Sequence, residues 1–312
     1  MTDELQDAIE SLIGAAAPSV LKQASEGLSK NYAQGRGSRS IFESEPARLA
    51  YLAARMPATF GAVSAVLRQL PGSPSSWLDL GAGPGTASWA ASSLFPEANA
   101  FTLIEQNSHA IAVGKRLAKG HRVLGKAEWI SAALPRDLPD ADVAILSYSL
   151  GELDRPPLMI DSWWKASIPF LVIVEPGTPR GFSCIRNARD QILSLGGSLI
   201  ATCTNSLSCP MKENDWCHFS ARIPRSRLHR YLKAGSLGYE DEKYSYLIAS
   251  KHPVSLIEKR SRIIRAPQKH SGHVRLSLCT DRGVSEDITV GRSKKEFYRK
   301  ARDASWGDIW EM

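Results

Sequence analysis

One segment constrains the fold of this chain more than any other: the glycine-rich sequence Asp-Leu-Gly-Ala-Gly-Pro-Gly-Thr at residues 79–86. A short apolar run precedes it, and a run with helical periodicity follows it. The glycines allow a sharp turn and let the backbone approach a ligand closely, while the start of the next helix presents free N–H groups. The order strand, glycine loop, helix therefore predicts a Rossmann-type fold that binds a nucleotide-like cofactor.

The spacing of the glycines favours S-adenosylmethionine (SAM) over a dinucleotide. Dinucleotide sites carry G-x-G-x-x-G, with the third glycine inside the helix. This chain has G-x-G-x-G, with Asp79 before it at the strand end, which resembles the first motif of SAM-dependent methyltransferases. The resemblance implies that Asp79 lies near the methionine part of SAM. The loop residues expected to hold the cofactor are Gly81, Ala82, Gly83 and Gly85.

Two further segments are expected to line the same site. Glu105 ends the next predicted strand, where an acidic side chain can accept hydrogen bonds from both ribose hydroxyls; the alternative is a surface glutamate. Residues 147–153 follow the fourth predicted strand, where this fold binds its acceptor. Ser147 and Glu152 are the candidate catalytic residues, and Ser147 is also expected to contact SAM. Glu152 could instead cap the following helix.

Strand-like and helical runs alternate from Trp77 onward. The predicted strands cover residues 77–80, 100–104, 123–130, 141–147 and 170–174. The predicted helices cover residues 86–95, 108–118, 156–167 and 183–195. This alternation predicts a parallel sheet covered on both faces.

The chain is predicted to have three parts. Residues 1–70 are helical by their apolar spacing, and Pro, Gly and Ser at 71–76 end that region. Residues 71–200 form the SAM-binding Rossmann domain. Residues 201–312 hold a loop with clustered cysteines, a returning strand at 244–249 and a basic module with strands at 273–278 and 288–290 and a helix at 294–301. The fold class is thus α/β, a class I SAM-methyltransferase domain with an N-terminal helical segment and a small β-rich C-terminal module.

The positive charge of the chain is concentrated near its C-terminus. The net charge is +7, and residues 251–312 hold 14 Lys and Arg against 8 Asp and Glu. A basic surface attracts polyanions through phosphate contacts and counterion release, so nucleic acid is the favoured partner, with a solvated face as the alternative. A basic loop around Arg36 and Arg39 is expected to add to that contact.

The sequence favours the cytoplasm and no membrane partner. We find no apolar run that approaches the length of a bilayer span, and the N-terminus has neither a signal nor a transit pattern. The five cysteines are consequently not expected to form structural disulfides.

Three cysteines lie close together in the sequence: Cys203, Cys209 and Cys217, with Cys279 much later. Clustered thiols in a polar, aperiodic loop indicate a metal site rather than unrelated buried cysteines. The short paired knuckles of structural zinc sites are absent, and Cys209 precedes a proline, as cysteines of ferredoxin clusters do. An iron–sulfur cluster is therefore favoured, and zinc stays open. Cys184 falls in a predicted helix and is expected to be a small buried residue.

Several segments together resemble one family, the methyltransferase-like proteins of the small ribosomal subunit, which act in ribosome assembly in bacteria and mitochondria. The matching segments are residues 50–59, 79–86, 147–153, 174–179, 209–210, 216–219, 244–247 and 306–308. The most specific are Trp-Cys-His-Phe at 216–219 and Glu-Pro-Gly-Thr-Pro at 175–179. The resemblance implies a [4Fe–4S] cluster held by Cys203, Cys209, Cys217 and Cys279, and small-subunit rRNA in the pre-ribosomal small subunit as the partner.

Two functions fit these patterns. The first is a SAM-dependent methyltransferase acting on small-subunit rRNA, with a structural cluster. The second is a catalytically inactive rRNA-binding assembly factor that retains the SAM site. The second stays open because residues 147–150 lack the Asn/Asp-Pro-Pro-Tyr motif of amino-methylating nucleic-acid enzymes, and no cysteine occupies a nucleophile position. A small-molecule methyltransferase would leave the basic module and the cysteines without a role. Away from the ribosome we expect a monomer.

Overall fold

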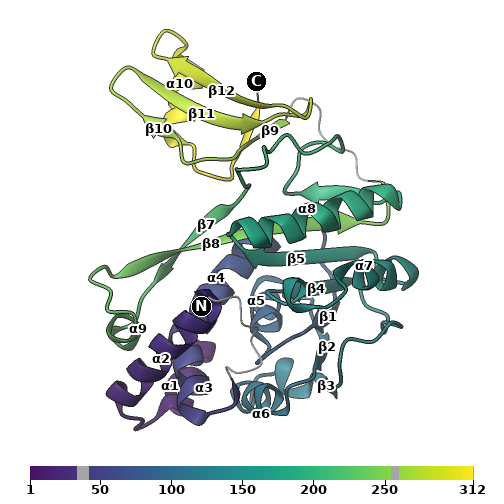
Figure 1. Ribbon diagram of the computed structural model, residues 1–312, viewed down its shortest axis with the longest axis vertical. Coiled ribbons are helices and arrows are strands. Elements are labelled where there is room, and N and C mark those ends of the chain that lie inside the picture. The colour runs from purple at the N-terminus through teal and green to yellow at the C-terminus, as the bar shows by residue number, and fades with distance from the viewer. Residues whose placement is uncertain (34–41, 254–259, 312) are drawn as a thin grey trace. The chain divides into compact units, whose positions relative to one another are not determined.

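The computed structural model describes residues 1–33, 42–253 and 260–311 (Figure 1). Its contacts define two units. Unit 1 comprises Met1–Ile168 with Ala221–Glu242, and unit 2 comprises Pro169–Ser220 with Lys243–Met312. The predicted basic loop around Arg36 and Arg39 lies outside the described residues. The three-part division at residues 70 and 200 stays a prediction. The two units follow other boundaries, since each gathers segments from more than one of the predicted parts.

Unit 1 contains four parallel strands in the order β3-β2-β1-β4. They are β1 (Ser76–Leu80), β2 (Ala100–Glu105), β3 (Glu128–Ser131) and β4 (Val143–Ser147). The connecting helices are α5 (Thr86–Leu94), α6 (Ser108–Leu117) and α7 (Pro156–Lys165), with a 3₁₀ turn η4 (Leu150–Glu152) after β4. Asp79 lies opposite both Leu103 and Ile145, so the carboxyl ends of β1, β2 and β4 meet at one edge.

For one strand of this sheet, the predicted start was wrong. Residues 123–130 were expected to be extended, but Leu124–Lys126 forms a 3₁₀ turn, η3, and β3 begins only at Glu128. The ring nitrogen Nδ1 of His121 accepts the N–H groups of Val123 and Leu124 at 3.2 and 3.0 Å. This local side-chain bond holds the turn against the β-propensity of its apolar residues.

The N-terminal part of unit 1 is helical, as the apolar spacing predicts. Its helices are α1 (Asp3–Ile13), α2 (Pro18–Ala33), α3 (Glu45–Ala50), the π-helical turn η2 (Tyr51–Arg55) and α4 (Met56–Leu67). The run Glu45–Leu67 is long and apolar enough to cross a membrane by length and composition, which corrects our expectation that no run approaches that length. Two thirds (67%) of its most apolar window is buried inside the fold, as in a core helix.

Residues 221–242 complete unit 1. Here β7 (Phe219–Pro224) and β8 (Tyr239–Ser250) pair, and α9 (Arg227–Leu232) lies at their connection. Arg225 and His229 both contact the carboxylate of Glu240, at 2.8 and 3.2 Å.

Unit 2 places one long strand antiparallel between two earlier ones, in the order β5-β8-β6. The outer strands are β5 (Phe170–Pro176) and β6 (Ser198–Ala201), and α8 (Pro179–Ser194) packs along them (Figure 1). The α8 helix starts earlier than predicted because the Thr178 hydroxyl caps it and proline is tolerated in its first turn. The antiparallel strand distinguishes this fold from a dinucleotide-binding domain. Together with the strand order of unit 1, it confirms the predicted class I methyltransferase fold.

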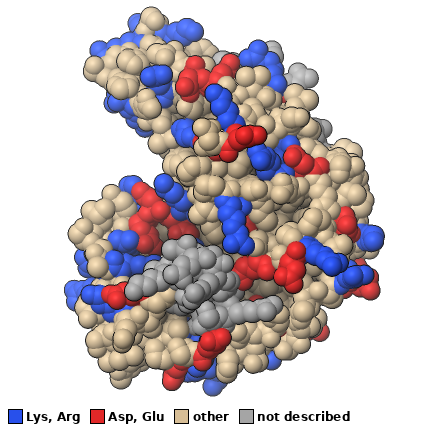
Figure 2. All heavy atoms as spheres, in the orientation of Figure 1, with Lys and Arg blue, Asp and Glu red and all other residues tan. Residues whose placement is uncertain are grey.

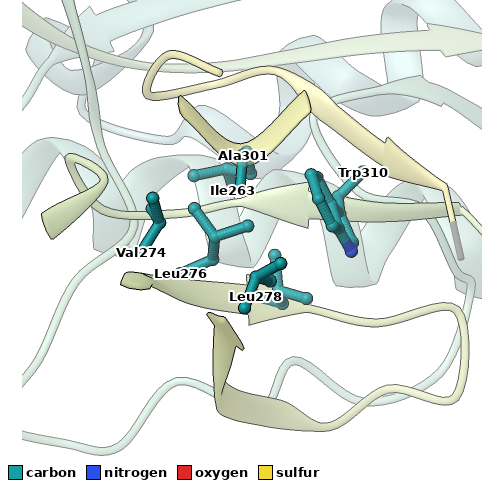
Figure 3. Close-up of a cluster of buried hydrophobic side chains, with 7 residues drawn as sticks. Ile263, Val274, Leu276, Leu278, Ala301 and Trp310 are labelled. Atoms are coloured by element: carbon teal, nitrogen blue, oxygen red, sulfur yellow. The ribbon is translucent and has the colours of Figure 1, made fainter. Parts of the chain in front are cut away.

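The C-terminal module of unit 2 is a small sheet with its own core. Its strands are β9 (Arg260–Ile263), β10 (Gln268–Lys269), β11 (His273–Cys279), β12 (Ser285–Gly291) and β13 (Ile309–Glu311), and its helix is α10 (Lys295–Asp303). Alternate side chains of β11 point inward with Ala301 and Trp310, as Figure 3 shows for Val274, Leu276 and Leu278. The module is thus β-rich, as predicted.

Candidate functional site

The glycine loop of unit 1 is closed on one side and open on the other. Gly81, Gly83 and Gly85 all have positive φ, at 72°, 55° and 84°. A Cβ on Gly81 would lie 2.7 Å from the Cβ of Ser149, so this glycine is required by a close approach within the protein. A Cβ on Gly83 would meet nothing within 4 Å. The loop therefore presents its backbone to open space at Gly83, where a cofactor can approach.

Glu105 braces this loop from the end of β2. One carboxylate oxygen accepts the Gly83 N–H at 2.9 Å, and the other accepts the Asn107 N–H at 2.7 Å. The side chain is half-buried, and each carboxylate oxygen has a second lone pair that can accept a further hydrogen bond. The structure thus brings the predicted ribose ligand against the predicted cofactor loop.

Asp79 is buried, with 1% of its surface exposed, at the end of β1. Its Oδ2 accepts the backbone N–H of Ser88 at 3.2 Å and the Ser88 hydroxyl at 2.7 Å, which ties the first turns of α5 to β1. Burial raises the pKa of Asp79 to about 6, although the bonds from Ser88 oppose the shift. Asp79 therefore supports the glycine loop by tying α5 to β1, and ionisation of its buried carboxyl group lowers the stability of the fold.

The segment after β4 lies against the glycine loop, as predicted. Ser149 donates its hydroxyl proton to the carbonyl of Leu80 at 2.8 Å. The Ser147 hydroxyl is buried and, among the described residues, has no hydrogen-bond partner. Tyr148 between them has φ of 58°, a left-handed conformation that is strained for a bulky residue and concentrates at functional sites. Glu152 is exposed in η4.

Sequence patterns missed a second group of side chains beside this segment. The Tyr148 hydroxyl donates to Glu242 at 3.1 Å, and the Arg55 guanidinium pairs with the same carboxylate at 3.1 and 3.2 Å. The guanidinium also lies 5.4 Å from the centre of the Tyr148 ring. Arg55 comes from the π-helical turn, a deviation that often marks functional sites. Its only sequence signal was its place in the family-like segment 50–59, and Glu242 had none.

The four predicted metal ligands line one cavity in unit 2. Cys203, Cys209, Cys217 and Cys279 all lie in its wall. Cys184, which was expected to be buried, is half-buried and is not one of the lining residues. Among the residues that the structure describes, no three His, Cys, Asp or Glu side chains converge closely enough to hold one metal ion. The thiols thus surround a space rather than a point.

Separate contacts hold the cysteine-bearing segments around this cavity. The Cys217 carbonyl accepts the hydroxyl of Ser245 on β8 at 2.8 Å. The Cys279 carbonyl accepts the Thr204 hydroxyl at 3.3 Å. Asn205, further along the same loop, donates to the Thr280 carbonyl at 2.8 Å. Three distant parts of the chain are fixed in this way by bonds that do not involve sulfur.

Burial favours the protonated form of three of these thiols. It raises the pKa of Cys279 to about 12 and that of Cys217 well above its usual value, and the neighbouring cysteines raise both further. Burial also raises the pKa of Cys203, but a buried arginine, Arg189, opposes that shift. A bound metal would have to displace these protons, because only thiolates are ligands.

Aromatic rings lie beside the cavity. His218 stacks on Trp216 at 5.3 Å and meets Trp306 edge-on at 4.8 Å between ring centres. The Trp216 indole N–H donates to the Gly177 carbonyl at 3.0 Å. His218 is therefore held by packing between aromatic rings.

The basic residues on and beside α10 in the C-terminal module are exposed. Figure 2 shows charges of both signs on the drawn face of this module. The exposed cations on and beside α10 are Arg292, Lys294, Lys295, Arg299, Lys300 and Arg302. Lys300 also forms an exposed pair with Glu296 at 3.4 Å, which is worth little in water. This surface can attract a polyanion.

Comparisons with known proteins agree with the family resemblance. The family described as "Mitochondrial small ribosomal subunit Rsm22" matches residues 45–311. The human protein "Ribosome assembly protein METTL17, mitochondrial" is 28% identical over 287 residues, covering 84% of this chain and 62% of the human protein. "Rsm22-cox11 tandem protein 2, mitochondrial" of Schizosaccharomyces pombe is 26% identical over 338 residues, covering 86% of this chain and 43% of that protein. The chain thus spans less than two thirds of the length of either relative.

A solved structure, a SAM-dependent methyltransferase from Aquifex aeolicus, superposes with a TM-score of 0.43 at 12% identity, covering 67% of this chain and all (100%) of that one. The assignment of the fold rests on the strand order described above.

Proposed function

Since this chain belongs to the Rsm22 family of the mitochondrial small ribosomal subunit, we propose that it binds SAM at the glycine loop and acts as a methyltransferase-like factor in small-subunit assembly. The observation that carries the SAM part is the loop itself, whose backbone is open at Gly83 and braced there by Glu105. The assembly part rests on the family and on the names of the relatives.

Each residue around the loop has a proposed task. Glu105 would accept the ribose hydroxyls, the loop backbone at Gly83 would lie against the cofactor, and the unpaired Ser147 hydroxyl would find its partner there. Asp79 would position the loop from below through Ser88. SAM supplies an electrophilic methyl group. The chain's own contribution to transfer would be positioning of an rRNA base flipped into the cleft, with Ser147 and Glu152 beside it.

Direct measurement of SAM binding tests the site. Isothermal titration should give saturable binding by the wild-type protein and roughly 10–100-fold weaker binding by Glu105→Gln, the loss expected for hydrogen bonds to a charged group. Glu128→Gln is the matched control, because Glu128 is an exposed acid at the start of the neighbouring strand β3. Equal affinities of all three proteins would reject the proposed site.

Turnover separates the methyltransferase from its inactive alternative. A specific observation favours the alternative: the polar groups of Tyr148 and Ser149 are already committed to Glu242 and the Leu80 carbonyl. In cells lacking the protein, complementation by Asp79→Ala and Glu105→Ala should fail if methyl transfer is the function. Small subunits that assemble normally with either variant would leave the assembly factor as the function.

RNA binding is proposed for the basic C-terminal module. Affinity for small-subunit rRNA fragments should fall steeply with salt, because Lys and Arg contacts release counterions. Reversing the charge of Arg299 and Arg302 should reduce both the affinity and its salt slope. Salt-insensitive binding, or none, would favour a small-molecule methyltransferase. We place the protein with the ribosome; its cytoplasmic location remains a prediction from sequence, whereas the relatives' names are mitochondrial.

We also propose a [4Fe–4S] cluster in the cysteine cavity. The placement of all four cysteines in the wall of one cavity supports it, and four cysteine thiolates are the ligand set of such a cluster. The cluster would tie the loop and the C-terminal module to the rest of unit 2. Anaerobic purification should give a brown protein with about four irons per chain. One zinc per colourless chain would instead support the zinc alternative.

A further inference from the structure

Two buried cations flank the cysteine cavity of unit 2. Arg189 on α8 is 3% exposed and Arg262 on β9 is 6% exposed, and both line the cavity. Arginines are almost never buried without an anion, because an uncompensated buried charge is costly. Arg189 forms an ion pair with Asp190. The Asp190 carboxylate is 57% exposed, however, and lies on the solvent side of the guanidinium.

The inner side of Arg189 faces sulfur. Its Nε donates to the Sγ of Cys203 at 3.3 Å. A second nitrogen donates to the carbonyls of Asn205 and Leu207, so the planar guanidinium bridges Cys203 and the loop that follows it. Arg262 donates to the carbonyl of Thr202, directly before Cys203, at 3.0 Å.

The charges of a loaded site explain this placement. Four thiolates outweigh a divalent core, whether an oxidised [4Fe–4S] cube or zinc, so the centre would be a buried anion. Arg262 lies opposite Cys279 in the register of β9 and β11, and Arg189 contacts Cys203, so the two cations approach the centre from different elements. Such partners outside the ligand shell orient the ligands and tune the metal.

We infer that Arg189 is a positioning residue of the proposed metal centre: its guanidinium donates a hydrogen bond to the Cys203 thiolate, which raises the reduction potential of a bound cluster and slows loss of metal. This inference rests on the proposed cluster. A hydrogen bond to sulfur and a nearby positive charge both favour the reduced, more negative state of an iron–sulfur centre. Removing them shifts the potential to more negative values.

The test compares the anaerobically purified wild-type protein with Arg189→Leu and Arg189→Lys. Reductive titration followed by electron paramagnetic resonance should give a more negative midpoint for R189L and an intermediate one for R189K, which keeps the charge but loses the fork of donors. Iron release to a chelator should be roughly 10–100-fold more favourable in R189L, the usual effect of losing an outer-shell partner. If R189L does not fold, R189K carries the comparison.

Two matched variants separate this role from simple support of the loop. Asp190→Asn removes the negative charge of the outer partner of Arg189 and leaves the thiol contact, so both readouts should match wild type. Thr204→Val removes a loop bond to the Cys279 carbonyl without touching sulfur, so it should change iron release but not the midpoint. A midpoint for R189L equal to that of wild type overturns the inference.

Failure of the proposed cluster gives a different result. If the wild-type chain holds one zinc, the cluster is wrong, and the inference is tested by replacing zinc with Co²⁺. The thiolate-to-cobalt charge-transfer band should then shift in R189L and stay unchanged in D190N; an unshifted band rejects the role of Arg189. A wild-type protein that binds no metal rejects both proposals.

Discussion

The glycine loop and the cysteine cavity are two sites built in opposite ways. The loop site draws on neighbouring strand ends, and its main carboxylates are already satisfied: Glu105 by Gly83 and Asn107, and Asp79 by Ser88. The cysteine cavity draws on α8, an irregular loop and β11, and its groups are cysteine thiols and buried arginines. The carboxylates of the loop site are thus hydrogen-bonded before a ligand arrives, whereas the cysteine cavity gathers thiols and buried cations that the proposed anionic centre would pair.

Loss of the proposed metal should have the largest effect, and that effect should fall on unit 2. Structural metals in small domains contribute on the order of 10 kcal/mol to folding, so Cys217→Ser should lose metal and the fixed packing of residues 202–217. SAM binding, a property of the loop in unit 1, should survive. Limited proteolysis and titration with SAM measure the two effects on the same sample.

Cys184→Ser is the control, because Cys184 does not line the cavity. It should keep the metal. If Cys217→Ser lost SAM binding as completely as it lost metal, the glycine loop of unit 1 would depend on the cysteine cavity of unit 2. The contrast drawn between the two sites would then be wrong.

Two glycine substitutions sharpen the description of the loop site. Gly81→Ala places a Cβ 2.7 Å from Ser149 at a positive φ, so it should lower the free energy of unfolding by about 3 kcal/mol from strain and overpacking. Gly83→Ala meets no atom within 4 Å and should cost only about 1 kcal/mol. Its methyl group projects into the proposed cofactor space, however, so it should abolish SAM binding.

Urea unfolding and SAM titration of both variants give the readouts. The expected pattern is a stability loss in G81A and a selective binding loss in G83A. Normal SAM binding by G83A would mean that the cofactor does not lie on the open side of the loop.

The same contrast explains what the sequence could predict. The loop, Asp79, Glu105 and Ser147 were identifiable because each follows a strand, and parallel strands bring their carboxyl ends to one edge. The four cysteines were identifiable from their chemistry, since clustered thiols rarely lack a role. Arg55 and Glu242 were not, because a pair separated by 187 residues leaves no local pattern. Arg189 and Arg262 look like ordinary surface cations until the fold buries them.

Burial of Asp79 should make the free energy of unfolding depend on pH. Burial raises its pKa from 3.8 to about 6, so between these values the folded state holds a proton that the unfolded state has lost. The free energy of unfolding therefore falls as the pH rises through this window, by at most about 3 kcal/mol, and is flat above it. Asp79→Asn removes this decline, so its stability relative to wild type should grow between about pH 4 and pH 7.

Asp142 provides a control of opposite sign. Burial opposes the shift, but hydrogen bonds from the N–H groups of Ser75 and Ser76 hold its pKa below the usual value. Its stabilisation is present above the unfolded pKa and is lost as the pH falls through the folded one, so Asp142→Asn should lose stability at neutral pH. Urea midpoints across pH measure both variants, and parallel curves for D79N and wild type would refute the assigned cause.

The smallest effect should come from the group that sequence patterns missed. Arg55 and Glu242 form a half-buried pair, with side chains 23% and 12% exposed. A double-mutant cycle with Arg55→Ala and Glu242→Ala should give a coupling energy of about 1–2 kcal/mol, between the values for exposed and buried pairs. Tyr148→Phe should cost about 1 kcal/mol through the lost bond to Glu242.

The same substitutions also test function. If Arg55 and Glu242 hold residues 147–153, the predicted acceptor-binding segment, in the strained conformation of Tyr148, all three substitutions should change methyl transfer or RNA contact while SAM affinity stays the same. Loss of SAM affinity in Y148F would instead make Tyr148 part of the cofactor site, and the loop would then depend on distant residues much as the cysteine cavity does.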